Sequence, residues 1–137
     1  MAITVNPTNL EQMEFDVTTA EGPCRVTVVT GNLPAGAQAF SSSETVVTQS
    51  TSVNALVDPT LTPGQFRKAT ATAAFASISA NANAVPHSFQ VSIDQVDATF
   101  DGQSGRTEIR VDVTVSVANG LASIQGIRFQ VTTLAKL

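Results

Sequence analysis

The chain has 137 residues, a single cysteine and a formal net charge of −4, and only 13% of its residues are charged. This length is typical of one domain with its own core, and the abundance of valine, threonine, alanine and serine favours strands and turns. Without a basic patch the chain is unsuited to nucleic acid, and no apolar run approaches the roughly 20 residues of a membrane-spanning helix. We therefore expect one β-rich domain over residues 1–137 that binds neither nucleic acid nor membrane.

The N-terminal part of the chain predicts three short strands. The first is Ala2–Val5, and the other two, Met13–Val17 and Cys24–Val28, alternate apolar with polar residues. The segment Gly31–Pro34 contains two strong breakers, so we expect the third strand to stop there and Ala35–Ser43 to form a loop.

The next segment is unusually poor in charge. Between Val26 and Phe66 there is no lysine or arginine, and Glu44 and Asp58 are the only acidic residues. Residues 45–57 are rich in β-branched side chains and predict one strand with a defect or two short strands. A strand-forming surface without charge is typical of one that another chain covers. The candidate assembly contact consists of Thr45, Val46, Val47, Thr51, Val53, Ala55 and Val57.

Residues 62–80 are compatible with two structures. Thr62 as N-cap, Pro63 at the first position and Gln65 at the capping-box position favour a helix, as does the high alanine content. Alternating alanines and threonines favour a strand, and an exposed helix would have little charge beyond Arg67 and Lys68. We prefer the strand and keep the helix as the alternative.

The C-terminal third has the clearest pattern. From Ile109 to Val117 every second residue is apolar, which predicts a strand with one buried face. The Asn119-Gly120 step that follows is a strong hairpin signal. Together with the preceding strand Phe89–Phe100, this predicts an antiparallel three-stranded meander over residues 88–134.

Phase changes in this meander predict two bulges, at Asp94-Gln95 and near Gly126-Ile127. With these bulges Val111 pairs with Val96 on one side and with Phe129 on the other. On the solvent side the same register sets Asp97 opposite Arg110 and Asp112 opposite Arg128. The candidate charge face consists of Asp94, Asp97, Arg110, Asp112 and Arg128. Cross-strand ion pairing explains these charges more simply than acid–base chemistry or a Ca²⁺ site.

Catalytic and metal-binding patterns are weak. His87 and Cys24 are the only residues of their kinds, so the sequence offers neither zinc-ligand spacing nor a framed nucleophile–base pair. The sequence from Asp101 to Gly105 predicts a turn and lacks the later carboxylates of a calcium loop. No tryptophan or tyrosine is present to stack a sugar or a base. We predict no catalytic, cofactor-binding or metal-binding residues.

The predicted fold is an all-β, single-domain antiparallel sandwich or barrel with a bent C-terminal meander, and the alternative adds one helix at 62–80. The expected function is that of a non-enzymatic structural subunit that forms homo-oligomers or larger assemblies through β surfaces, such as a virion, tail, filament or appendage component. A monomeric ligand- or protein-binding module is the alternative, and an enzyme that uses the carboxylates is the third hypothesis.

The start of the chain bears on localisation. The first residues have neither a basic start nor an apolar run, so no signal peptide is predicted. Localisation therefore stays open between a virion, the cytoplasm and an extracellular assembly.

Overall fold

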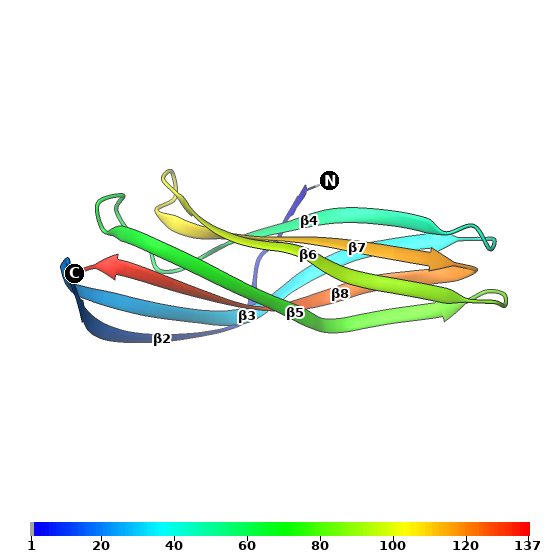
Figure 1. Ribbon diagram of the computed structural model, residues 1–137, viewed down its shortest axis with the longest axis horizontal. Helices are drawn as coiled ribbons and strands as arrows, with labels where there is room; N and C mark the ends of the chain where they lie inside the picture. The colour runs from blue at the N-terminus through cyan, green and yellow to red at the C-terminus, as the bar shows by residue number, and fades with distance from the viewer. Residues whose placement is uncertain (1) are drawn as a thin grey trace.

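The computed structural model describes residues 2–137, which form two four-stranded sheets packed face to face (Figure 1). Sheet I has the strand order β1 (Ala2–Thr4), β4 (Val47–Val57), β7 (Arg106–Ala118), β6 (Ser88–Asp101). Sheet II has the order β2 (Thr8–Thr19), β3 (Gly22–Ser41), β8 (Gly120–Lys136), β5 (Phe66–Ala82). The fold is the predicted β-sandwich, and residues 66–82 form a strand, so the helical alternative is wrong. Residues 2–137 contain no helix that could span a membrane.

Strand β7 forms the centre of the core. Its apolar residues alternate towards sheet II, and all five are at most 1% exposed: Ile109, Val111, Val113, Val115 and Val117. They pack against inward residues of β8 such as Ile124 and Phe129. Burial of one such side chain contributes about 1.5–3 kcal/mol, so this alternation is a major source of stability.

The pairing of β6 with β7 agrees with the sequence prediction. Ile93 lies across from Val113 and Val96 across from Val111, with a register shift between Ile93 and Gln95. The bulge at Asp94 keeps apolar residues on the inner face on both sides of the shift, as the change of phase in the sequence requires.

The predicted hairpin between β7 and β8 is wrong. Strand β7 pairs with β4 along the whole length of β4 and with β6 on its other edge, so it has no edge left for β8. Strand β8 lies in the other sheet, between β3 and β5. The predicted pairs Val111–Phe129 and Asp112–Arg128 therefore do not form, and the meander over 88–134 is reduced to the β6–β7 hairpin.

The Asn119-Gly120 step instead carries the chain from one sheet to the other. Asn119 has a positive φ of 53°. Its N–H donates to the Ser43 carbonyl at 2.8 Å, and its side-chain Nδ2 donates to the Pro86 carbonyl at 2.6 Å. A Cβ atom at Gly120 would overlap the Asn81 carbonyl oxygen and would lie 2.8 Å from Cδ2 of His87. The crossover is therefore packed too tightly for a side chain at Gly120.

The phase change near Gly126 is real, but its partners differ from the prediction. Ile124 and Ile127 are both buried, whereas Gln125 between them is exposed. The register shifts here lie in the pairings of β8 with β3 and with β5. The break thus keeps β8 apolar towards the core while it pairs with two strands of sheet II.

Strand β3 is longer than predicted. It continues through Gly31–Pro34 and takes in residues expected to form a loop. Leu33, Ala35 and Ala37 point inwards and are at most 4% exposed. The breakers are tolerated because β8 pairs with β3 on both sides of a shift between Pro34 and Ala37.

Replacing Val113 with Asp should prevent folding, because a carboxylate in the core costs several kcal/mol. Ser116→Asp, on the outer face of the same strand, is the matched control and should fold. Solubility and far-ultraviolet circular dichroism measure the outcome. A folded Val113→Asp protein would contradict the assignment of the inner face.

Replacing Gly120 with Ala should lower the free energy of unfolding by about 1–3 kcal/mol, because the new methyl group must displace backbone at the crossover. Gly102→Ala is the control, since nothing lies within 4 Å of a Cβ atom at that position. Chemical denaturation of the three proteins makes the comparison. Equal stability would show that the crossover is not tightly packed.

Candidate functional site

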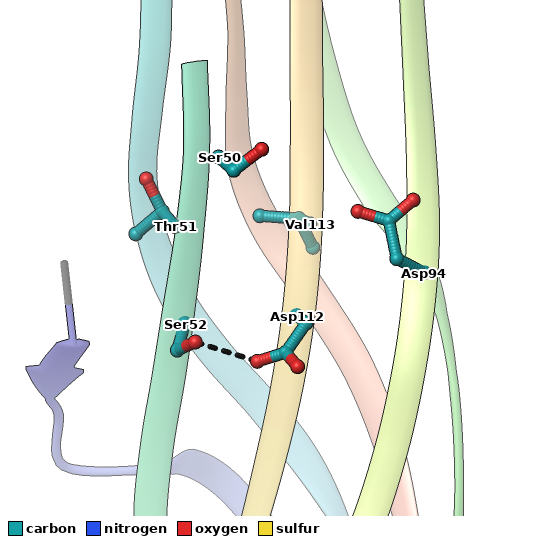
Figure 2. A pocket seen from close by; sticks show the side chains of 6 residues that line it. All are labelled: Ser50, Thr51, Ser52, Asp94, Asp112 and Val113. Carbon is teal, nitrogen blue, oxygen red and sulfur yellow. Dashed lines mark hydrogen bonds between the residues drawn. The ribbon is translucent and has the colours of Figure 1, made fainter.

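A shallow hollow lies on the outer face of sheet I, where β6 bulges away from β7. It is lined by Ser50, Thr51, Ser52, Asp94, Asp112 and Val113. Figure 2 shows Asp94 and Asp112 on neighbouring strands and the hydrogen bond between Ser52 and Asp112. These two carboxylates make the hollow the strongest candidate for a chemical site.

The carboxylates of this hollow are held by hydroxyl donors. Asp94 accepts hydrogen bonds from Thr114 Oγ1 and, at 2.8 Å, from Ser92 Oγ. Asp112 accepts one from Ser52 Oγ and one from Arg110 Nε, the latter at 3.0 Å. Each carboxylate is therefore fixed by neighbours on its own or the adjacent strand.

The hydrogen bond from Ser52, followed by the contact with Arg110, holds the pKa of Asp112 below its ordinary value. An efficient general acid needs a raised pKa, so Asp112 is suited to remain an anion. Residues 2–137 contain no group of three or more His, Cys, Asp or Glu side chains placed to hold a metal ion. The two carboxylates belong to a hydrogen-bond network that joins β4, β6 and β7.

Hydroxyl pairs extend this network along the outer face. Thr48 and Ser116 lie 2.9 Å apart, oxygen to oxygen, and Ser50 and Thr114 lie 3.1 Å apart. Short side chains of this kind leave the β4–β7 part of the face flat.

The structure divides the predicted charge face between the two sheets. Asp97 lies across from Arg110, as predicted, although its carboxylate accepts a hydrogen bond from Gln95 at 2.8 Å. Asp94 and Asp112 lie on the same outer face. Arg128 lies in β8, across from Asn32 and Ala74, so its assignment to this face is wrong. The cause is the move of β8 to sheet II.

The predicted assembly contact is partly internal, with three of its seven residues buried. Val53, Ala55 and Val57 are at most 1% exposed, so their side chains cannot contact another subunit in this fold. Val47 and Thr51 are half-buried, and Thr45 and Val46 are exposed. Burial against sheet II therefore accounts for the lack of charge at Val53, Ala55 and Val57, whereas the other four predicted contact residues keep part of their surface exposed.

An apolar patch on the outer face of sheet II escaped the sequence analysis. Met13 and Phe15 of β2 are 60% and 47% exposed and pair with Val28 and Val26 of β3. Leu134 of β8 lies on the other side of Val26. We name these five residues the apolar patch. The alternation of β2 was visible in the sequence, but the side it would face was not.

The inner side of β2 is polar. Glu14 and Asp16 both pair with Arg25, and Asp16 Oδ1 lies 2.9 Å from Arg25 Nε. The main contacts of β2 are with β3 rather than with sheet I, so Glu14 and Asp16 can face inwards while Met13 and Phe15 face solvent. Cys24, on the adjacent strand, is buried, and its sulfur lies 3.6 Å from Thr19 Oγ1.

Comparison with known proteins gives this chain no identity. No family model, no curated protein and no solved structure matches it. The function is therefore argued from the geometry of the chain itself.

Replacing Asp112 with Asn should lower the free energy of unfolding at pH 7 by about 1 kcal/mol or less, because the pair is partly exposed. The folded pKa of Asp112 lies below its ordinary value of 3.8, so the ionised group stabilises the fold above that value. This contribution is lost as the pH falls through the folded pKa. Urea unfolding at pH 7 and at about pH 3 should show the difference shrinking in acid.

Asp97→Asn is the matched control for this substitution. The Asp97 carboxylate accepts one side-chain hydrogen bond, from Gln95, so its replacement should change stability less. An Asp112 effect of the same size at both pH values would contradict the proposed charge contribution.

Proposed function

We propose that this protein is a non-enzymatic structural subunit that associates with further copies of itself through its β surfaces, as a virion, tail, filament or appendage component does. The observation that carries the proposal is the apolar patch on sheet II. It joins side chains of three adjacent strands on one outer face. Contiguous exposed apolar surface of this kind typically marks a contact with another protein.

The energetics of β2 support association. Burial of a side chain such as Met13 or Phe15 contributes about 1.5–3 kcal/mol, and the isolated chain gains only part of that. A second copy placed on the patch would supply the missing burial. The inward Glu14 and Asp16 have Arg25 as a partner, so turning β2 over would break these ion pairs.

The exposed edges of the sheets support the same proposal. Strand β1 pairs with only Ser52–Asn54 of β4, and β2, β5 and β6 are edge strands. Unpaired edge N–H and C=O groups can bond to a strand of a neighbouring molecule. Face contacts and edge contacts together suit a subunit of a larger assembly.

The test is the mass of the purified protein by size-exclusion chromatography with light scattering. The wild type should form oligomers at micromolar concentration. Met13→Ser with Phe15→Ser should raise the dissociation constant at least roughly tenfold, equivalent to about 1.4 kcal/mol of lost burial.

Phe40→Ser is the matched control. Phe40 is 58% exposed and lies at the opposite end of β3 from the patch, so its replacement should leave association nearly unchanged. A wild type that stays monomeric at about 100 μM, well above the micromolar range of ordinary specific contacts, would overturn the proposal in favour of a monomeric binding module.

A further inference from the structure

The lysines and arginines of the chain fall into two groups. Four of the seven pair with carboxylates within the chain: Arg25, Arg67, Arg106 and Arg110. Among residues 2–137 the other three, Lys68, Arg128 and Lys136, form no ion pair within 4.0 Å. These three are therefore free to attract an anionic partner.

All three unpaired cations lie on the outer face of sheet II. Arg128 alternates with the buried Ile127 and Phe129 and is itself exposed. Lys136 and Lys68 are exposed at the end of the adjacent strands β8 and β5, where Lys68 pairs with the outward Leu134. Glu11 is the one acidic side chain on this face, since its partner Thr30 alternates with the buried Val29 and Gly31. The face has a formal charge of +2.

The outer face of sheet I has the opposite sign. The outward acidic residues of β6 and β7 are Asp94, Asp97, Asp101, Glu108 and Asp112, and the outward cations of these strands are Arg106 and Arg110, which gives a formal charge of −3. The hydrogen bond that Asp112 accepts from Ser52 Oγ favours the ionised form of this carboxyl group. The sandwich thus has one acidic and one basic outer face.

The two charged areas occupy the same part of the sandwich. Strands β5 and β6 contact each other across the core, as β7 and β8 do, so the basic strands lie beneath the acidic ones (Figure 1). The ring of Phe66 stacks on that of Phe100 with centroids 4.8 Å apart. Lys68 follows Phe66 closely, and Thr99, across from Glu108, precedes Phe100. Lys68 and Glu108 are therefore at the same end of the molecule, on opposite faces.

We propose that copies of this chain stack head to tail, with the basic outer face of sheet II on the acidic outer face of sheet I of the next copy. This proposal rests on the self-association proposed above and adds which face of one copy contacts which face of the next. The cations of sheet II lie beneath the carboxylates of sheet I. A translation perpendicular to the two sheets therefore places the cations of one copy against the carboxylates of the next.

A symmetric face-to-face dimer is disfavoured by the same charges. In a contact between two sheet II faces, both faces would have a formal charge of +2, and between two sheet I faces both would have −3. Like charges that face each other across an interface are costly. A head-to-tail contact leaves one free face of each sign at the two ends of the stack. The contact is heterologous, so it generates an open filament, or a ring if successive rotations close.

The remaining surface of the two faces is compatible with this packing. Next to the charged strands, β4 presents Ser52, Asn54 and Leu56, and the strand beneath it in the other sheet, β3, presents Val26 and Val28 of the apolar patch towards the same end of the sandwich. Stable contacts of about 800 Å² per partner on each of two faces would cover about a fifth of the 7384 Å² surface of the chain. A molecule of this size can therefore take part in two such contacts.

Charge reversal on each face, followed by mixing, tests the polarity. The first variant, Lys68→Glu with Arg128→Glu and Lys136→Glu, makes both outer faces acidic. The second, Asp97→Lys with Glu108→Lys, makes sheet I basic while Asp94 and Asp112 keep their hydroxyl partners. Each variant alone should show at least a tenfold higher dissociation constant by light scattering, and an equimolar mixture should assemble again.

A matched control separates face-specific attraction from net charge. Glu21→Lys with Glu44→Lys changes the net charge by the same amount as the second variant, but both residues lie in turns. This control keeps both wild-type faces, so it should take up the first variant only at one end of a stack and should not let the first variant continue the stack. Raising the salt from about 0.05 M to 0.5 M should weaken the wild-type assembly, because the contact depends on exposed charge.

The outcomes distinguish the two proposals. A monomeric wild type would contradict both the proposed self-association and the proposed head-to-tail contact. A wild type that assembles while the first variant assembles equally well would overturn the head-to-tail contact and leave self-association standing. Circular dichroism confirms folding of each variant, and Arg128→Glu alone serves where the triple variant does not fold.

Discussion

The structure depends on the fact that a β-strand has two edges, and both edges of β7 are occupied within sheet I. Strand β4 pairs with it over residues Val47–Val57, and β6 pairs with it on the other side. The inner face of β7 is a continuous row of branched apolar side chains that must be covered. The strand that follows therefore crosses to sheet II and supplies that cover, with Ile124, Ile127 and Phe129 facing β7 across the core.

This crossing also sets the distribution of charge. In a hairpin with β7, Arg128 would lie beside Asp112 and neutralise it. In the sandwich Asp112 pairs with Ser52 and Arg110 instead, and Arg128 lies on the opposite outer face. Separation of the two charges by the thickness of the core makes one face acidic and the other basic. The polarity of the surface is thus a consequence of topology rather than of net charge, which is only −4.

Local pattern was enough to predict part of this fold. The phase change at Asp94 fixes the β6–β7 register because both strands lie in one hairpin with one buried face. The strand at 66–82 followed from its lack of charge. The β4–β7 pairing could not be predicted, since its partners are separated by about 60 residues of chain and many valine-rich strands would fit equally well. The Asn119-Gly120 step led to the wrong hairpin prediction, because a residue with positive φ can occupy a crossover between sheets as well as a hairpin turn.

The charge content of a strand did not reveal whether its apolar side chains are covered, as β4 and β2 show. In β4 the uncharged side chains that alternate inwards are covered by the chain's own second sheet, so they need no partner. In β2, Glu14 and Asp16 face inwards to Arg25, and Met13 and Phe15 face solvent. Only the second case leaves burial incomplete within the chain. The proposed association surface is therefore the apolar patch, although the sequence of β2 is normally charged, and Lys68 and Lys136 lie next to Leu134 of this patch.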